Sequence, residues 1–416
     1  MKSFPFIVGV TALISVLCVG RAQASATGAT TTVLYSFTGG RDGRNPVGPL
    51  IFDNAGNLYG TAQYGGVGCG VIFELSPPAQ GTTWTESVLH TFNCRTNDSY
   101  PTAGLVFDQS GNLYGTTSGT AFQLSPPAAP GGSWTYTVLH KFGGADKPDG
   151  GQPNGNLILD QAGNLYGTAY SGGAFVCSIG PGPCGLVFEL LRPAQLGGSW
   201  EEKVLDDFSD VPDGSYPAAG VVFDNKGNLY GNTTSGGTGP CTDGEGLTIG
   251  CGTAFELSPT FEGSWTETVL YNFGPAEDSP GNPFVFGVDG SLYGTAGYDV
   301  FRLIHPAIGE SWRHQRLFTF TSGISGTIPS SGVTIAGNRG LFGTTASSGL
   351  SGFSTAFELS LPVKNGQLTL TTLQTFGTGF DSNQPRGGLV RGKDGAFYGA
   401  TSANAGGNGF IFKIVP

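Results

Sequence analysis

One pattern of apolar and polar positions recurs seven times between Val33 and the end of the chain. Each copy has a short strand that ends in Phe, a polar Gly-rich loop that ends at a proline, and a second apolar strand. A turn, typically Asp-x-x-Gly-Asn, then leads into Leu-Tyr-Gly-Thr and a further strand that contains Phe. Short apolar runs between turn residues predict strands, and no stretch has a sustained helical period. The pattern therefore predicts four short strands in each copy.

The repeat is marked by one phenylalanine and one proline in each copy. The strand-ending phenylalanines are Phe37, Phe92, Phe142, Phe208, Phe273, Phe320 and Phe376, and the loop-ending prolines are Pro46, Pro101, Pro153, Pro217, Pro280, Pro329 and Pro385. A repeat of roughly 40–50 residues with four strands is typical of a β-propeller. We therefore predict an all-β fold, a seven-bladed β-propeller with four-stranded blades.

The two ends of the repeat region predict how the ring closes. If the strands of a blade are lettered a to d from the axis outward, residues 31–37 form a strand d that no blade precedes. Residues 410–416 form a strand c with no strand d after it. We expect the N-terminal strand to complete the last blade, so that residues 31–416 form a single propeller domain after a short segment at 25–30.

The first residues have the features of a secretory signal peptide. Lys2 supplies a positive charge, residues 6–19 are apolar but too short to span a bilayer, and Ala22 and Ala24 fit the small-x-small cleavage pattern. We expect residues 1–24 to be removed and the protein to be secreted, to the extracellular space or the periplasm. No other segment is long and apolar enough for membrane insertion.

The cysteines beyond that segment predict three disulfides. They are Cys69, Cys94, Cys177, Cys184, Cys241 and Cys251, and an even number in an exported protein indicates disulfide pairing. Cys177 with Cys184 and Cys241 with Cys251 would each close one long loop. Cys69 begins a strand c, Cys94 follows the next strand d, and antiparallel neighbours bring these ends together. We therefore predict the pairs Cys69–Cys94, Cys177–Cys184 and Cys241–Cys251.

Charge and composition narrow the class of partner. The chain has 30 acidic and 19 basic residues, for a formal net charge of −11. Nucleic acid is excluded as a partner, since phosphate binding needs clustered Lys and Arg. Cations and neutral ligands such as sugars stay open. The 72 Gly and 26 Pro agree with many short strands joined by tight turns.

The repeated motifs resemble the GloVer tandem repeat of exported bacterial proteins. Gly-Asn-Leu-Tyr-Gly-Thr at 111–116 and Gly-Thr-Ala-Phe-Glu-Leu at 252–257 carry the resemblance, which covers Val33 to the C-terminus. The fifth and sixth copies depart from it, with Ser291 and Gly340 where the family favours Asn. The resemblance implies a β-propeller-like architecture and no established activity.

The loops vary in length on one face of the predicted ring, which we call the loop-rich face. It carries the d–a and b–c loops, whereas the a–b and c–d turns on the opposite turn face are nearly constant. Variation confined to one face marks a binding face in repeat proteins. Our candidate binding residues there are Asp42, Asp98, Asp149, Asp213, Asp243, Glu245 and Asp381. They would bind a cation such as Ca²⁺ or sugar hydroxyls, or form only a solvated acidic rim.

Other recurring residues have a structural interpretation beside a functional one, and we favour the structural one for each. Turn aspartates fit Asx turns as well as Ca²⁺ ligands, namely Asp53, Asp108, Asp160 and Asp224. Strand glycines fit close packing of adjacent blades as well as close approach of a ligand, for example Gly60, Gly115 and Gly167. The tryptophans fit packing as well as sugar platforms, namely Trp84, Trp134, Trp200, Trp265 and Trp312. Strand-d histidines fit an outer surface role, namely His90 and His140.

No His/Cys metal spacing and no Ser-His-Asp arrangement is readable, so we predict no catalytic residue, no metal site and no cofactor. The sequence favours a non-catalytic binding or interaction module, active as a monomer, whose loop-rich face binds a glycan, a peptide or a surface component. A structural extracellular scaffold and a lyase or hydrolase with carboxylates in the axial funnel are the alternatives.

Overall fold

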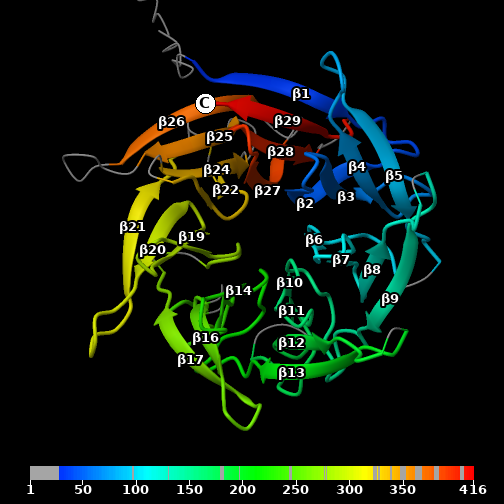
Figure 1. The fold of residues 1–416 in the computed structure, drawn as a ribbon. Helices are drawn as coiled ribbons and strands as arrows, with labels where there is room; N and C mark the ends of the chain where they lie inside the picture. Colours follow the sequence, from blue (N-terminus) through cyan, green and yellow to red (C-terminus); the bar gives the residue numbers. More distant parts are fainter. Residues whose placement is uncertain are drawn as a thin grey trace, which may run out of the picture.

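A computed structural model shows seven antiparallel sheets arranged in a ring around one axis (Figure 1). The structure describes residues 28–416 except 96–97, 130, 179–181, 196, 243–245, 276, 278, 322–325, 327, 338–339, 347–352, 361–367, 379–383 and 403–406. No helix occurs among the described residues. The predicted all-β, seven-bladed β-propeller is therefore confirmed. The expected signal peptide, residues 1–24, lies outside the described residues.

Each sheet is one blade, and its strands a to d follow one another from the axis outward. Blade 1 contains β2 (Arg44–Phe52), β3 (Leu58–Tyr64), β4 (Val71–Ser76) and β5 (Thr85–Thr91). Blade 2 contains β6 (Val106–Phe107), β7 (Leu113–Thr116), β8 (Thr120–Ser125) and β9 (Thr135–Lys141). Blade 3 contains β10 (Ile158–Leu159), β11 (Leu165–Ala169), β12 (Leu186–Leu191) and β13 (Glu201–Asp207). Blade 4 contains β14 (Val222–Phe223), β15 (Leu229–Asn232), β16 (Thr253–Pro259) and β17 (Trp265–Asn272).

The remaining blades keep this order with two variations. Blade 5 contains β18 (Val285–Phe286), β19 (Leu292–Ala296), β20 (Asp299–Ile304) and β21 (Arg313–Thr319). In blade 6 the innermost strand is split into β22 (Ile328–Pro329) and β23 (Thr334–Ile335), followed by β24 (Gly340–Ala346), β25 (Phe353–Ser360) and β26 (Thr369–Thr378). Blade 7 contains β27 (Gln384–Arg391), β28 (Phe397–Ser402), β29 (Phe410–Val415) and β1 (Thr30–Ser36).

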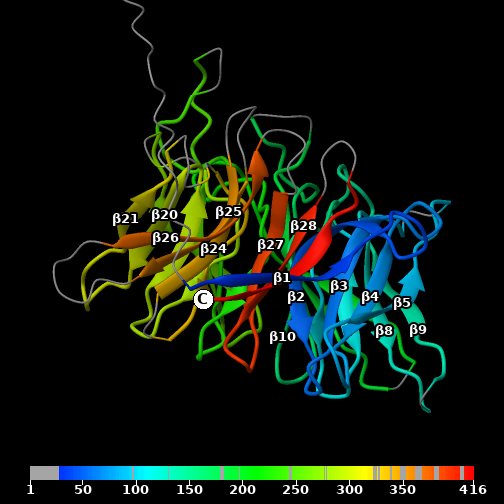
Figure 2. The same ribbon diagram turned by 90° about the horizontal axis from the view of Figure 1, so that it is seen from above.

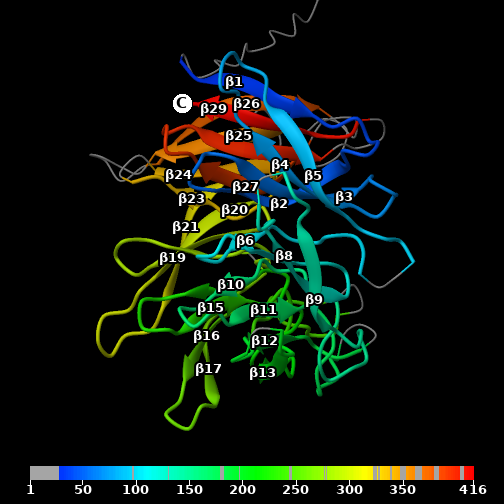
Figure 3. The same ribbon diagram turned by 45° about the vertical axis from the view of Figure 1, so that its right-hand side comes forward.

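The ring closes as the sequence predicts, because β1 is the outermost strand of blade 7. It pairs antiparallel with β29, from Thr30 opposite Val415 to Ser36 opposite Phe410, with one irregularity on the way. Figures 1 and 3 show β1 beside β29 at the outer edge of this blade. Strands from the two ends of the repeat region therefore share one sheet.

The glycine in the middle of each strand b makes room for an aromatic ring of its own blade. A Cβ atom at Gly60 would lie 2.7 Å from Cζ of Phe73 in strand c and 2.8 Å from Cδ2 of Leu50 in strand a. The corresponding glycine of every other blade meets its strand c phenylalanine within 3.0 Å: Gly115, Gly167, Gly231, Gly294, Gly343 and Gly399. The expectation that these glycines let adjacent blades pack was therefore wrong, because the ring that fills the space belongs to the same sheet.

Close packing between blades depends instead on glycines that lie in the innermost strands or directly precede them. A Cβ atom at Gly48 of blade 1 would overlap the backbone of Gly104 in blade 2, and one at Gly155 of blade 3 would overlap Gly220 in blade 4. Seven strands converge at the axis, so their backbones approach closely only where side chains are absent. This contact brings the inner walls of the blades together around a narrow axial channel.

Tryptophan and tyrosine fill the outer part of the blade interfaces on the turn face. Each tryptophan is half-buried and packs on the strand b tyrosine of the preceding blade, with ring centroids 6.1–6.4 Å apart in the pairs Trp134–Tyr59, Trp200–Tyr114, Trp265–Tyr166, Trp312–Tyr230 and Trp84–Tyr398. The last pair joins blade 1 to blade 7. These contacts support the packing interpretation of the tryptophans over sugar platforms.

The turn aspartates hold the a–b hairpins. Asp53 accepts hydrogen bonds from the Asn57 backbone N–H at 2.9 Å, the Asn57 side-chain amide at 2.8 Å and the Tyr59 hydroxyl at 3.3 Å. The same three bonds form around Asp108, Asp160 and Asp224. Because both carboxylate oxygens are engaged within the turn, the structure supports the Asx-turn interpretation over Ca²⁺ binding.

Candidate functional site

The long loops extend from one face of the ring (Figure 2). Three disulfides tie loops of this face: Cys69–Cys94, Cys177–Cys184 and Cys241–Cys251. These are the pairs expected from the sequence. The first joins the b–c loop of blade 1 to the loop that leads into blade 2, and each of the other two closes a b–c loop on itself. The loop-rich face is therefore covalently constrained in blades 1, 3 and 4.

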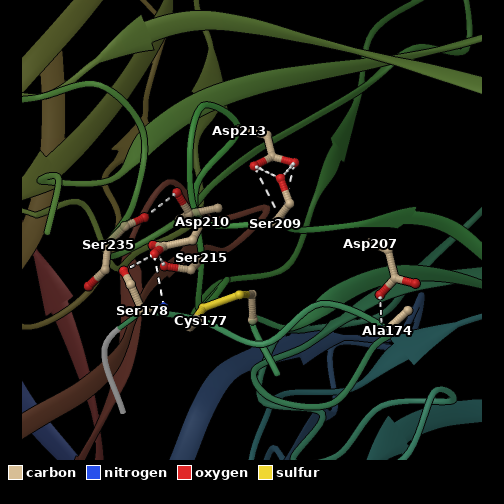
Figure 4. Close-up of a disulfide and its surroundings, with 11 residues drawn as sticks. Ala174, Cys177, Ser178, Asp207, Ser209, Asp210, Asp213, Ser215 and Ser235 are labelled. Carbon is tan, nitrogen blue, oxygen red and sulfur yellow. Dashed lines mark hydrogen bonds between the residues drawn. A yellow bond between two sulfur atoms is a disulfide. The ribbon is translucent and has the colours of Figure 1, made fainter. Parts of the chain in front are cut away.

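Hydrogen bonds add to the constraint beside the Cys177–Cys184 disulfide (Figure 4). The Asp210 carboxylate is buried and accepts hydrogen bonds from the Ser178 backbone N–H at 3.1 Å and the Ser215 hydroxyl at 3.1 Å. The Ser178 hydroxyl also donates to Asp210. These bonds join the b–c loop of blade 3 to the next d–a loop. Asp210 thus acts within the scaffold of the face.

The four candidate carboxylates that the structure describes do not gather in one site. Asp42, Asp98, Asp149 and Asp213 each lie at a different blade interface, and Asp243, Glu245 and Asp381 lie outside the described residues. Each of the four described carboxylates accepts hydrogen bonds from groups at its own blade interface. The Thr38 backbone N–H donates to Asp42 at 2.6 Å, and the Gly143 N–H donates to Asp149 at 3.0 Å.

The same holds for the other two described candidates. The Ser209 N–H and hydroxyl donate to Asp213 at 3.2 and 2.9 Å, and Asp98 accepts from the hydroxyls of Tyr136 and Thr120. The four described carboxylates therefore stabilise loops at separate interfaces, and the binding role expected of these acidic residues stays a prediction.

Each of these acids belongs to an interblade cluster, which we define by three positions. The first position lies two residues before the strand-ending phenylalanine of one blade. The second position lies six residues before the strand-ending phenylalanine of the next blade. The third position is the acidic residue in the d–a loop that connects these two blades. From the blade 7–1 interface to the blade 4–5 interface, the clusters are Tyr35/Glu86/Asp42, His90/Tyr136/Asp98, His140/Glu202/Asp149, Asp206/Glu267/Asp213 and Tyr271/His314/Glu277. Direct contacts within them include the stacked rings of His90 and Tyr136 at 4.0 Å and the bond from the Tyr35 hydroxyl to Asp42 at 3.0 Å.

Burial perturbs the ionisation of the clusters. It raises the pKa of Glu202 and Glu267 to about 8 and that of Glu86 and Asp206 to about 7, with nearby carboxylates adding to the effect. Burial also lowers the pKa of His140, against the opposing charge of Asp149. For Asp42, burial alone would raise the pKa, but the hydrogen bonds from Thr38 and Tyr35 lower it overall.

One cluster brings three potential metal ligands within reach of a single ion. The Nε2 atom of His140 lies 3.6 Å from Oε2 of Glu202 and 3.9 Å from Oδ2 of Asp149, and one ligand atom from each residue lies within 4.8 Å of the others. Among the residues that the structure describes, this is the one such set. The sequence gives no sign of this set, because the three residues come from two blades and the loop between them and so have no metal-ligand spacing along the chain.

The axis of the ring opens on the loop-rich face into a funnel of about 550 Å³, continuous with a narrower channel of about 280 Å³. All seven blades contribute to the funnel wall, and the polar residues that the structure describes there are Gln63, Thr102, Asn154, Asn282, Ser330, Gln384 and Arg386. No described residue of the wall is a carboxylate. The funnel therefore presents amides, hydroxyls and one guanidinium.

Some of these groups are free to bind a ligand. Gln63, Asn154 and Arg386 have no side-chain hydrogen-bond or ion-pair partner among the described residues, and Arg386 is exposed. Sequence reasoning missed the funnel residues. A signal was present, because in six blades the residue directly after the loop-ending proline lies in the funnel wall, and its identity varies strongly: Val47, Thr102, Asn154, Ala218, Ser330 and Arg386.

A second hollow, of about 880 Å³, lies on the turn face between the a–b turns of blades 2, 3 and 4. It is larger than the funnel, but its aspartates, Asp108, Asp160 and Asp224, are engaged in their own turns. Its wall repeats one turn sequence, whereas the funnel wall combines different side chains from all seven blades. We therefore regard the funnel as the better candidate binding site.

Comparison with solved structures shows the fold. The extracellular domain named as part of a hybrid two-component system of B. thetaiotaomicron is 14% identical, with a TM-score of 0.53 over 93% of this chain and 42% of that one. The PQQ domain of pyranose dehydrogenase from Coprinopsis cinerea is 15% identical, with a TM-score of 0.45 over 95% of this chain and 98% of that one. This chain thus spans about two fifths of the length of the extracellular domain that it matches.

Sequence comparison identifies the family. No curated protein matches the chain. The profile of the Gloeobacter/Verrucomicrobia repeat matches residues 22–128 and 118–302, which together cover more than half of the chain and the first four blades completely. The GloVer resemblance of the repeated motifs is thereby confirmed. The chain belongs to the Gloeobacter/Verrucomicrobia repeat family.

Proposed function

We propose that this propeller is a non-catalytic binding module that takes an oligosaccharide in the axial funnel of its loop-rich face. The observation that carries the proposal is the polar lining of the funnel, in which the described residues are amides, hydroxyls and one guanidinium without a carboxylate, and to which all seven blades contribute. Amides and hydroxyls both donate and accept hydrogen bonds, as sugar hydroxyls do. Arg386 adds one positive charge, which suits a sugar that carries a carboxylate.

The rigidity of the face supports a binding role. Three disulfides and the Asp210 bonds hold the surrounding loops, so little conformational entropy is lost when a ligand binds. Gln63 and Asn154 need no rearrangement of internal hydrogen bonds before they contact a ligand. The funnel of about 550 Å³ is within the size range of small-molecule sites.

The lining favours binding over the hydrolase or lyase alternative. Glycoside cleavage of the usual kind needs two carboxyl groups on either side of the scissile bond, and the described wall of the funnel offers amides and hydroxyls instead. No specific observation favours a pure scaffold. Disulfides persist in oxidising compartments, so we place the module outside the cytoplasm, in the extracellular space or the periplasm, as a monomer.

Thermal unfolding of the purified protein against oligosaccharides tests the proposal. The panel contains neutral glucans and xylans and a uronic-acid series. A ligand that binds only the folded state stabilises it by about 2.7 kcal/mol at a concentration of 100 times Kd. We expect a saturable rise of the midpoint with one sugar class, which Asn154→Ala abolishes. If that class is acidic, Arg386→Ala abolishes the rise as well.

The matched control is Gln161→Ala, which deletes an exposed side-chain amide that lines the turn-face hollow. This variant should retain the full response to the sugar. Loss of the response in Gln161→Ala together with retention in Asn154→Ala would transfer the binding site to the turn face. A flat response of the wild-type protein to every sugar class would overturn the proposal.

A further inference from the structure

Several interblade clusters leave a buried polar atom without a hydrogen-bond partner, but among the described residues only the cluster between blades 2 and 3 leaves both an imidazole nitrogen and a carboxylate oxygen in this state. Nε2 of His140 and Oε1 of Glu202 are buried and have no hydrogen-bond partner. The Glu202 side chain is only 9% exposed, and its second oxygen, Oε2, lies 3.6 Å from the same histidine nitrogen. Burial of polar groups without partners is costly. A bound cation that reaches both side chains would remove this cost.

We propose that His140, Asp149 and Glu202 bind a divalent transition-metal ion, with zinc as the ion that the geometry fits, and that this ion joins the outer strands of blades 2 and 3. Zinc takes histidine nitrogen and carboxylate oxygen at about 2.0–2.2 Å. Tetrahedral ligands at these distances lie about 3.3–3.6 Å apart. The separations of 3.6 and 3.9 Å from His140 Nε2 to the two carboxylates therefore need only a small closure.

The elements that carry the ligands position them for this role. His140 lies on β9, Glu202 lies on β13, and Asp149 lies in the loop that connects the two blades. The Gly143 N–H donates a hydrogen bond to Oδ2 of Asp149 at 3.0 Å and so holds this carboxylate in place. An imidazole with two carboxylates and an open fourth position is a mixed nitrogen and oxygen set that zinc accepts and that a hard cation such as Ca²⁺ favours less.

The other clusters satisfy part of the same positions with direct contacts, although Oε1 of Glu86 and Nε2 of His314 are also buried without hydrogen-bond partners. Between blades 7 and 1, Tyr35 replaces the histidine and donates its hydroxyl proton to Asp42 at 3.0 Å. Between blades 4 and 5, Nδ1 of His314 lies 3.1 Å from Glu277, which also accepts from the Tyr271 hydroxyl at 2.7 Å. Among the described residues, the blade 2–3 cluster is the one that combines an imidazole with two carboxylates at mutual reach.

Metal titration of the tag-free, chelator-treated protein tests the proposal. Calorimetry with zinc chloride should show one ion per chain, and saturating zinc should raise the thermal unfolding midpoint. Cobalt(II) should give the visible absorption of a tetrahedral site. Calcium and magnesium chloride should bind much more weakly.

Variants taken from the protein's own repeats keep the test independent of folding. His140→Tyr introduces the residue that blades 7 and 4 carry at this position, Tyr35 and Tyr271. It should weaken zinc binding by at least about 100-fold, and so should Glu202→Gln. The control His90→Tyr removes the equivalent histidine of blade 1 and should leave zinc binding unchanged. No zinc binding to the wild-type protein, or equal loss in His90→Tyr and His140→Tyr, would overturn the proposal.

Discussion

Replacement of Glu267 by glutamine should make this propeller more stable at alkaline pH and change the way its stability depends on pH. Glu267 lies in the cluster between blades 3 and 4, where burial and the charges of Asp206 and Asp213 raise its pKa from the ordinary 4.5 to about 8. One carboxyl oxygen is buried without a hydrogen-bond partner. Between these two pKa values the folded state retains a proton that the unfolded state has lost.

The sign and size of the effect follow from linkage. Because the folded state binds more protons in this window, the free energy of unfolding falls as the pH rises from about 4.5 to about 8 and then levels off. The full pKa difference corresponds to about 5 kcal/mol. Glu267 is partly exposed, so solvent screening reduces this to roughly 2 kcal/mol. A chain of this size unfolds with an entropy near 0.8 kcal/mol per kelvin, which converts that energy into about 2–3 °C.

The assay is differential scanning calorimetry of the wild-type protein and Glu267→Gln between pH 5 and pH 9. The variant should gain on the wild-type protein steadily as the pH rises and exceed it at pH 9. Glu262→Gln, an exposed carboxyl on the c–d turn of the same blade, is the matched control and should follow the wild-type curve. If the unfolding midpoints of Glu267→Gln and the wild-type protein change in parallel with pH, the reasoning is refuted. If the wild-type protein becomes more stable than the variant at high pH, the predicted effect has the opposite sign.

Three further predictions concern packing and loops. Gly167→Ala places a Cβ atom 2.6 Å from Cζ of Phe188 and should cost about 1–3 kcal/mol by calorimetry, part of which a second change, Phe188→Leu, should restore. Trp134→Ala should lower the unfolding midpoint because it opens the blade 1–2 interface, and oligosaccharide binding should stay intact. Loss of oligosaccharide binding in a variant of unchanged stability would instead favour the sugar-platform interpretation of the tryptophans. Cys177→Ser/Cys184→Ser should cost about 2 kcal/mol and speed hydrogen exchange in that loop alone, and global unfolding would contradict this.

The fold was predictable because the repeat expresses it locally in every copy. Strand length, the Asp-x-x-Gly-Asn turn and the unpaired strands at the two ends each specify one step of the architecture, and the structure forms the ring that they predict. The disulfide pairs followed from the same strand order. These features depend only on residues that are neighbours in the sequence or lie on adjacent strands.

The site was less predictable because it depends on directions that a loop sequence does not specify. Asp42 belongs to an exposed type of loop, yet a hydrogen bond from Thr38, four residues earlier, turns its carboxylate into a blade interface. Glu202 follows the exposed Glu201 on an outer strand and so resembles a solvent-facing side chain in the sequence, yet its side chain is only 9% exposed and lies against His140 of the neighbouring blade. Asn154 follows the proline that recurs in every copy of the repeat, but it reaches the funnel only because seven innermost strands converge.

The strand pairing that closes the ring also determines how the protein responds to tension. Thr30 of β1 lies opposite Val415 of β29, so the free ends of both strands are at the same end of an antiparallel ladder. A load that pulls these two residues apart acts perpendicular to the strands, so the hydrogen bonds between β1 and β29 break one pair after another. A load parallel to the strands would instead have to break all of these hydrogen bonds together. Under a load applied at Thr30 and Val415, the seam between β1 and β29 is therefore expected to open before the rest of blade 7.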